Sequence, residues 1–336
     1  FKLWEENIKL VLRRNPDYFE KDELGNQLPY LESVAITFLP DKQSEFLQFV
    51  QGKLDFVSGL DNSYKDEIVS TKGKLQEKYQ SQVNLITSPY LNTEYLGFYM
   101  DSPSSEIQSK KIRQAINYGF DRMKMIRYLR NGIGIPAVNG FIPKGLAGFN
   151  NLKGYTYQPE KAKELVRQYI EASGNNNPSI AIGTNSQYLD LCEFIQRELE
   201  KIGLSVKVDV IPPSSLRQGK ANGNLPIFRA SWVADYPDAE NYLSLFYSKN
   251  FAPNGPNYMH YKNDQFDKLY DKLFLTTENK ERYKLYQTMD SLIIQDAPIV
   301  PLYYDQFVRF SQKNVRGLST NPINLLNLKT VSKVRE

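Results

Sequence analysis

The sequence contains few of the residues from which most catalytic sites are built. Among its 336 residues there is one histidine, His260, and one cysteine, Cys192. A single histidine cannot supply several imidazole ligands to a metal ion and disfavours a catalytic triad, and a single cysteine excludes an internal disulfide. Apolar residues at helical spacing surround Cys192, so we predict that its side chain packs in a core. His260 is kept only as a minor candidate for ligand contact.

Long apolar runs and cofactor motifs are missing as well. No stretch approaches the ~18 consecutive apolar residues of a membrane-spanning helix. The chain has no phosphate loop GxxxxGK[ST], no dinucleotide fingerprint GxGxxG and no nucleophile elbow GxSxG. We therefore expect no cofactor, no metal and no catalytic residue. A hydrolase with paired carboxylates stays open as an alternative, because acidic residues are plentiful.

The charge pattern gives little support to a nucleic-acid partner. The 42 Lys and Arg residues nearly balance the 38 Asp and Glu residues, and the basic ones are scattered along the chain. Nucleic-acid-binding proteins usually gather basic residues in one stripe or patch. Aromatic residues, by contrast, make up 13% of the chain, with 23 tyrosines, a composition that suits a surface for varied ligands or a tyrosine-rich core.

The residue pattern predicts an α/β protein that is large enough for two lobes, because domains usually span about 100–200 residues. Residues 178–210 read as strand, helix, strand, which predicts a parallel crossover. One helical stretch is expected over 104–130, and Pro159 and Gly174 mark the start and end of another helix. The other expected elements are strands at 8–15, 31–39, 225–234 and 299–310, a helix running into a strand at 44–57, a loop at 134–149, and helices at 263–275 and 280–295.

The most informative segment is RASWVADYPDAENYL at 229–243, an apolar strand that ends in an aspartate and a proline turn. Further segments follow one another along the chain: FKLW (1–4), RRNPDYF (13–19), PYLESVAITFLPD (29–41), QGKLDFV (51–57), KIRQAINYGFDRMKMI (111–126), GFIPKG (140–145), YQPEKAKELV (157–166), HYKNDQFDKL (260–269) and APIVPLYY (297–304). Together they resemble the oligopeptide- and dipeptide-binding proteins of extracytoplasmic solute-binding protein family 5, which serve ABC importers.

The resemblance implies a two-lobed periplasmic-binding-protein-like fold of type II, with mixed sheets flanked by helices. Residues 1–100 with 305–336 are expected to build a discontinuous and incomplete first lobe, and 101–304 a second, ligand-clasping lobe. The family's N-terminal region is expected to be absent here. Implied with the fold are a periplasmic or cell-surface location, a lipid anchor on the missing part as an open option, a monomeric state, and delivery of a short peptide to a membrane permease after closure.

A receptor for peptides of varied sequence needs groups for the peptide's ammonium, its carboxylate and its backbone. We expect Asp235 to be enclosed and to bind the ammonium, with a turn cap as the alternative. Arg229 lies six residues earlier, so on a regular strand its side chain projects from the same face as that of Asp235. Its guanidinium suits a carboxylate. An internal salt bridge is the alternative for Arg229. The resemblance supports both roles.

The strand from Ala230 to Ala234 is expected to hydrogen-bond an extended ligand along its edge. Trp232 would wall the cleft, with packing between lobes as its alternative. The remaining candidate ligand contacts are Ser231, Val233, Ala234, Tyr303 and Tyr304. Three other interpretations stay open: the same fold binding an oligosaccharide, nickel complex or other small solute, the carboxylate hydrolase, and a sensor or chaperone.

Overall fold

The computed structural model describes residues 1–334, and the chain separates into two compact units. Unit 1 contains Phe1–Tyr90, Arg130–Gly132 and residues from Gln306 onward, whereas unit 2 contains Leu91–Leu129 and Ile133–Asp305. Unit 1 is therefore discontinuous in sequence. The interpretation of these units as lobes that close on a ligand stays a prediction.

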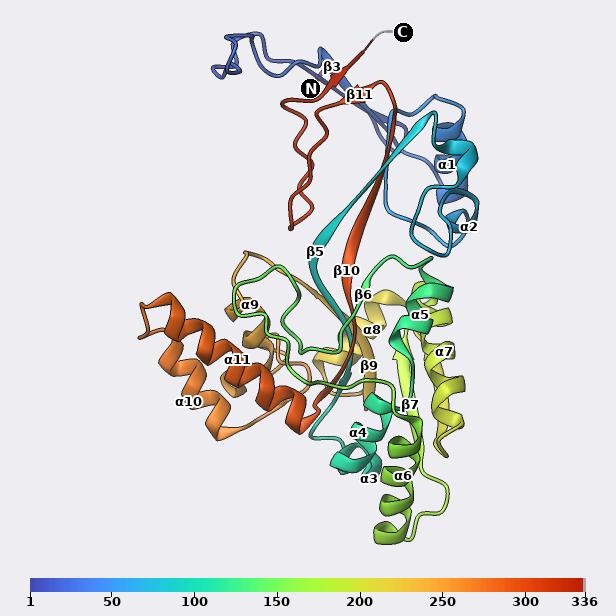
Figure 1. The fold of residues 1–336 in the computed structure, drawn as a ribbon, viewed down its shortest axis with the longest axis vertical. Coiled ribbons are helices and arrows are strands. Elements are labelled where there is room, and N and C mark those ends of the chain that lie inside the picture. Colours follow the sequence, from blue (N-terminus) through green and yellow to red (C-terminus); the bar gives the residue numbers. More distant parts are fainter. Residues whose placement is uncertain (335–336) are drawn as a thin grey trace. The chain divides into compact units, whose positions relative to one another are not determined.

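Unit 1 contains a three-stranded antiparallel sheet in the order β1-β2-β3, of which β3 is labelled in Figure 1. Its helix α1 begins where the Asp41 side chain accepts the Ser44 N–H, and the chain turns at Gly52 with a positive φ of 73°. The elements that lie wholly in unit 1 are β1 (Leu3–Glu5), β2 (Lys9–Arg13), β3 (Ser33–Thr37), α1 (Lys42–Val50), β4 (Phe56–Ser58), α2 (Lys65–Ile68), η1 (Glu77–Tyr79), β11 (Val315–Arg316) and β12 (Ser332–Lys333).

A larger mixed sheet has the strand order β4-β10-β5-β9-β7-β8. Its long strands β5 (Val83–Phe98) and β10 (Ile299–Gln312) contribute residues to both units. Within unit 2, β7 (Ser179–Thr184) and β8 (Ser205–Val210) are parallel and are joined by η2 (Ser186–Tyr188) and α7 (Leu189–Glu200). The predicted strand-helix-strand crossover is thus confirmed. The two remaining strands of unit 2 are β6 (Ile135–Pro136) and β9 (Ile227–Val233).

The expectation of one helical stretch over 104–130 is wrong in detail, since this segment folds as three helices. Extended backbone at Ser109 separates the first two, and Gly119 ends the second. The third starts where the Asp121 carboxylate accepts the backbone N–H groups of Met123 and Lys124. The helices of unit 2 besides α7 are α3 (Ser105–Gln108), α4 (Lys110–Tyr118), α5 (Arg122–Leu129), α6 (Pro159–Ser173), α8 (Pro213–Ala221), α9 (Glu240–Leu243), η3 (Ser244–Phe246), η4 (Ser248–Asn250), α10 (Asp264–Leu273) and α11 (Asn279–Asp296).

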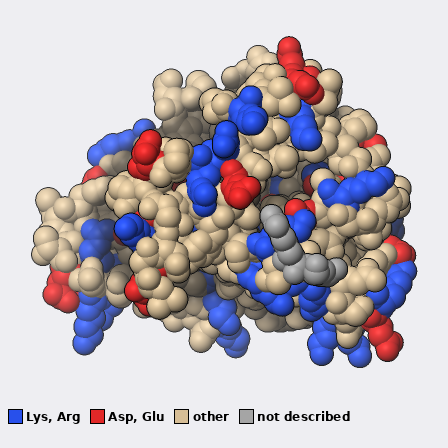
Figure 2. All heavy atoms as spheres, turned by 90° about the horizontal axis from the view of Figure 1, so that it is seen from above, with Lys and Arg blue, Asp and Glu red and all other residues tan. Residues whose placement is uncertain are grey.

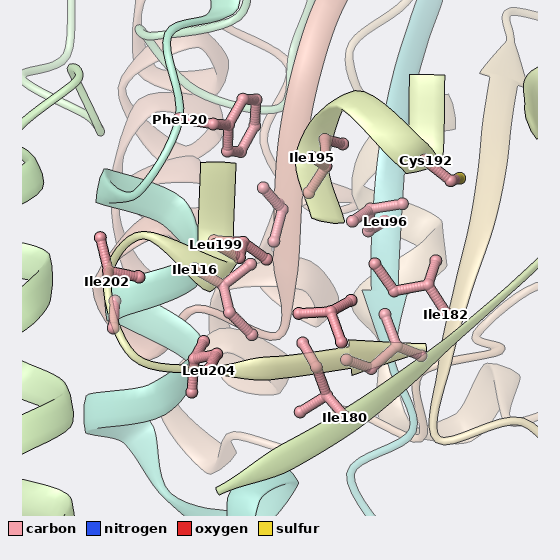
Figure 3. Packing of buried hydrophobic residues seen from close by; sticks show 14 of the residues in the cluster. Leu96, Ile116, Phe120, Ile180, Ile182, Cys192, Ile195, Leu199, Ile202 and Leu204 are labelled. Atoms are coloured by element: carbon pink, nitrogen blue, oxygen red, sulfur yellow. The ribbon is translucent and has the colours of Figure 1, made fainter. Parts of the chain in front are cut away.

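The core of unit 2 lies between its sheet and the helices α4 to α7. Figure 3 shows Ile116 of α4, Ile182 of β7 and Leu199 of α7 converging in this cluster. Cys192 is fully buried among them, which confirms its predicted place in a core. Burial raises the pKa of its thiol to about 11, so the thiolate is strongly disfavoured at neutral pH.

Acidic and basic side chains are mixed on the face shown in Figure 2, where Lys and Arg are interspersed with Asp, Glu and neutral residues. This distribution agrees with the scatter expected from the sequence. None of the helices within residues 1–334 combines the length and the apolar character that crossing a bilayer requires.

Candidate ligand-binding site

Strand β9 has one side that is paired for only two residues. On one side it pairs with β5 along its whole length, from Ile227 opposite Phe98 to Val233 opposite Asn92. On the other side, the parallel pairing with β7 covers Ile227 and Phe228 alone in the part of the chain that the structure describes. We call the unpaired side from Arg229 to Val233 the open edge of β9.

The register determines which backbone groups point to this open edge. The Ala234 N–H donates to the Leu91 carbonyl at 2.8 Å on the β5 side. Because residues of an antiparallel strand alternate between the two sides, Ala230 and Trp232 also bond toward β5. The N–H and C=O groups of Arg229, Ser231 and Val233 therefore face away from β5. The Arg229 N–H belongs to the bridge between Gly183 and Phe228, so the groups left for an extended chain are the Arg229 C=O and both backbone groups of Ser231 and Val233.

A buried amide organises the C-terminal end of the open edge. Asn241 is only 4% exposed, and its Oδ1 accepts the Trp232 Nε1–H at 2.9 Å and the Asp235 N–H at 3.1 Å. Its Nδ2 donates to Asp235 Oδ2 at 3.2 Å. One side chain thus fixes both the indole and the carboxylate. Sequence reasoning missed Asn241, although it lies within the DYPDAEN turn.

Asp235 is exposed, so the expectation of an enclosed carboxylate is wrong. Regular strand geometry ends at Val233, and the chain then turns toward α9. For the same reason the alternation that was expected to place Arg229 and Asp235 on one side does not extend to Asp235. The carboxylate keeps free acceptor positions beside the Asn241 amide, and its role in binding an ammonium stays a prediction.

Arg229 is buried and forms an ion pair with Glu94 of β5, which is the alternative left open for it. Glu94 lies opposite Ser231, two residues along the strand from Arg229, and also accepts from Asn92 Nδ2 at 3.1 Å. The guanidinium carbon lies 3.1 Å from the ring centroid of Tyr188. Burial acts to lower the pKa of Arg229, but the Glu94 carboxylate together with Tyr188 and Tyr303 outweighs it, and the pKa is raised. Binding of a ligand carboxylate by Arg229 stays a prediction. Its guanidinium already contacts Glu94 and Tyr188.

The other predicted contacts divide by exposure. Val233 is 39% exposed, and Ser231 and Trp232 are half-buried at the open edge. The buried members are Ala234, Tyr303 and Tyr304. The structure therefore brings the residues from Ser231 to Asp235 together along the edge, whereas the two tyrosines lie on β10.

Tyr304 is held by a loop of unit 2. Its hydroxyl donates to the Gly140 carbonyl at 2.8 Å, and Tyr303 and Tyr304 pair with β6. Burial raises the pKa of Tyr304, so the hydroxyl stays protonated. Ligand contact by these two side chains stays a prediction.

A buried carboxylate anchors that loop. Asp290 Oδ1 accepts the Phe141 N–H at 2.7 Å, and its Oδ2 accepts the Ile142 N–H at 3.4 Å. The Phe141 ring packs edge-on against Tyr242, whose hydroxyl donates to the Leu91 carbonyl at 2.6 Å. Leu91 is also the β5 residue that accepts from Ala234, so the loop supports the strand pair behind the open edge.

His260 is engaged by protein groups on both ring nitrogens. Nδ1 lies 2.8 Å from Asp101 Oδ2, and Nε2 lies 2.9 Å from the Ala252 carbonyl oxygen. The Phe251 ring stacks on the imidazole at 4.5 Å between centroids. This arrangement accounts for His260 as a structural residue. Within residues 1–334, no three His, Cys, Asp or Glu side chains gather as a metal site.

Two relatives are similar to this chain in sequence over most of its length. The probable D,D-dipeptide-binding periplasmic protein DdpA of Escherichia coli K12 is 25% identical over 99% of this chain and 61% of its own length. The glutathione-binding protein GsiB of the same strain is 24% identical over 88% of this chain and 56% of its own length. The chain thus spans less than two thirds of either relative.

A solved structure has a similar fold over nearly the whole chain. The periplasmic binding protein DppA of Helicobacter pylori, in complex with the peptide STSA, superposes with a TM-score of 0.80 and 27% identity. The match covers 98% of this chain and 61% of that protein. The fold is accordingly the type II periplasmic-binding-protein fold, as expected from the sequence.

The model of one family matches residues 1–254, which include β9 and the Asp235–Asn241 turn. The chain belongs to the bacterial extracellular solute-binding proteins of family 5.

Proposed function

We propose that this chain binds a short peptide in an extended conformation along the open edge of β9. The observation that carries the proposal is the alternation of backbone groups from Arg229 to Val233, which leaves the N–H groups of Ser231 and Val233 and the C=O groups of Arg229, Ser231 and Val233 on one side of the strand. A peptide added there would be bound through its main chain, so its side chains could vary.

The groups at the C-terminal end of the open edge would determine which end of the peptide binds there. Asp235 follows the last strand residues, and Asn241 holds one of its oxygens while the other stays available. A peptide ammonium would form a charge-assisted hydrogen bond with this carboxylate. Trp232, fixed by the same amide, would flank the first residue of the ligand.

The biological role we propose is the delivery of this peptide to a membrane ABC importer, by a monomer in the periplasm or at the cell surface. Support comes from DdpA and GsiB, which are named for a dipeptide and for glutathione, and from the peptide-bound DppA. The family and the fold are those of binding proteins, and we propose no catalytic step. The same role would allow a lipid anchor.

Calorimetric titration with a mixed pool of tri- and tetrapeptides tests the proposal. We expect saturable binding that N-acetylation of the pool or Asp235→Ala weakens at least tenfold, because each removes one partner of a charge-assisted hydrogen bond. Asp264→Ala, which removes another exposed carboxylate of unit 2, should leave the affinity unchanged. Equal affinity for the free and the acetylated pool would contradict ammonium recognition.

Turnover is followed in the same samples by mass spectrometry of the recovered peptides. Intact peptides are expected. Cleavage products would favour the carboxylate hydrolase instead.

A further inference from the structure

A positively charged side chain without a carboxylate partner stands at the other end of the open edge. Lys220 is half-buried on α8, and its Nζ lies 5.2 Å from the ring centroid of Tyr258 and 6.0 Å from that of Phe228. Phe228 is the last β9 residue that pairs with β7, so Lys220 lies where the open edge begins. No ion pair joins its ammonium to a carboxylate within residues 1–334.

The charges around Lys220 have an excess of positive sign. The groups that act on it are Arg217 on its own helix, Arg229 on β9 and Glu94 on β5. Burial, with smaller contributions from Arg229 and Arg217, lowers the pKa of Lys220 to about 8, and Glu94 opposes this shift. Glu94 is already paired with Arg229 and bonded to Asn92. The region therefore holds three cations and one carboxylate, which is committed elsewhere.

We propose that Lys220 binds a carboxylate of the ligand and so determines which ligands the site accepts. This inference rests on the proposed binding of an extended peptide. Asp235 follows one end of the open edge and Lys220 stands near the other end, and the ammonium and carboxylate of an extended peptide are likewise at its opposite ends.

Lys220 fits this role better than Arg229 does. The Arg229 guanidinium is buried, paired with Glu94 and covered by the Tyr188 ring. The Lys220 ammonium lies over the faces of two aromatic rings and forms no ion pair within residues 1–334. A carboxylate that reached it would form an ion pair partly shielded from water, where the attraction is stronger than at an exposed surface.

The carboxylate could be the C-terminus of the peptide or an acidic side chain, and three probes distinguish these sources. They are tetra-alanine, tetra-alanine amide, and the amide Ala-Ala-Glu-Ala-NH₂. Wild type is expected to bind tetra-alanine about ten- to a hundredfold more tightly than its amide, because one charge-assisted contact is lost. Recovery of this affinity by the glutamate-containing amide would identify a side-chain carboxylate as an equivalent ligand group.

Variants assign the effect to Lys220. Lys220→Met should remove the preference for the free acid over the amide, while Lys220→Arg, which keeps the charge, should retain it. Lys163→Met, an exposed lysine of α6, serves as the matched control and should behave as wild type. Circular dichroism of each variant confirms that it is folded.

Proton uptake gives a second readout. Titration of tetra-alanine at pH 8 in buffers of different ionisation enthalpy should show roughly half a proton more uptake by wild type than by Lys220→Arg, since pairing raises the pKa of a half-deprotonated lysine. The peptide's own amino group contributes equally to both proteins and cancels in the difference.

The outcomes separate this inference from the proposed function. If wild type binds tetra-alanine and Lys220→Met still prefers the free acid over the amide, the role of Lys220 is overturned and peptide binding stands. If wild type binds none of the three probes, both proposals are overturned.

Discussion

At the scale of single residues, the site depends on two kinds of contact that are hard to predict. One joins side chains that are far apart in sequence, and the other is made by a residue within a turn. The motif at 229–243 indicated Asp235 and Trp232, but Asn241 lies in a segment rich in turn residues, where an asparagine has no distinctive signature. Arg229 was found from its position, yet its partner Glu94 lies 135 positions away. A pairing of that kind depends on strand register, which the residue pattern alone does not specify.

Asn241→Ala tests the link between Trp232 and Asp235. The substitution removes three hydrogen bonds at once, and we expect it to lower the free energy of unfolding by about 1–3 kcal/mol. We also expect the affinity for the peptide pool to fall more than tenfold, as in Asp235→Ala. Urea unfolding and calorimetry measure the two effects. Asn177→Ala, at an exposed position of unit 2, is the control, and equal peptide affinity of the two variants would contradict the positioning role.

At the scale of elements, apolar periodicity predicted helices and strands correctly where apolar residues recur regularly. It missed elements where they do not. The crossover of β7, α7 and β8 was predicted, as were α10 and α11. Helix α8, which carries Lys220, was missed because Leu216 is its only buried residue and leaves no apolar stripe. The 16-residue strand β5 was missed as well, since its first half alternates little and its second half is buried on both faces.

Gly140→Ala tests the loop that supports the strand pair behind the open edge. Gly140 has a positive φ of 154°, and a Cβ there would overlap Asp290 Oδ2. We expect a loss of about 2 kcal/mol or more in the free energy of unfolding, because both backbone strain and the clash oppose the substitution. Gly174→Ala is the control, since its φ of 71° is also positive but its surroundings are open. A smaller loss for Gly140→Ala than for Gly174→Ala would show that the loop rearranges to accommodate the methyl group, and it would contradict the prediction.

Asp290 should make stability depend on pH. Burial raises its pKa from 3.8 to about 7, and the N–H groups of Phe141 and Ile142 oppose this only in part. The folded state thus retains a proton that the unfolded chain releases, so the stabilisation is fully present below about pH 4 and is lost as pH rises through about 7. The change is on the order of a few kcal/mol.

Urea unfolding of wild type and Asp290→Asn between pH 4 and pH 8 measures this contribution. The difference in unfolding free energy between the two proteins should follow the titration of one group. A difference that stays constant over this range would assign the pH dependence to other groups.

At the scale of the whole molecule, the order of motifs along the chain gave the family and the type II fold before any contact was known, and both are confirmed. Motif order identifies a family because many weak motif matches in one sequence add up to strong evidence. The exposure of a single side chain depends instead on how the chain turns after a strand. This is why the fold was predicted correctly while the burial of Asp235 was not. The division into units falls near residues 90 and 306, and their closure on a ligand stays a prediction.

Amide hydrogen exchange of the whole chain, read residue by residue with and without saturating tetra-alanine, is the most direct test of binding along β9. The N–H groups of Ser231 and Val233 should gain protection with the peptide, while those of Ala230 and Trp232 are already protected by β5 and that of Arg229 by β7. This alternating gain would establish an added strand at the open edge. Binding without any new protection at Ser231 and Val233 would contradict the account and place the peptide elsewhere.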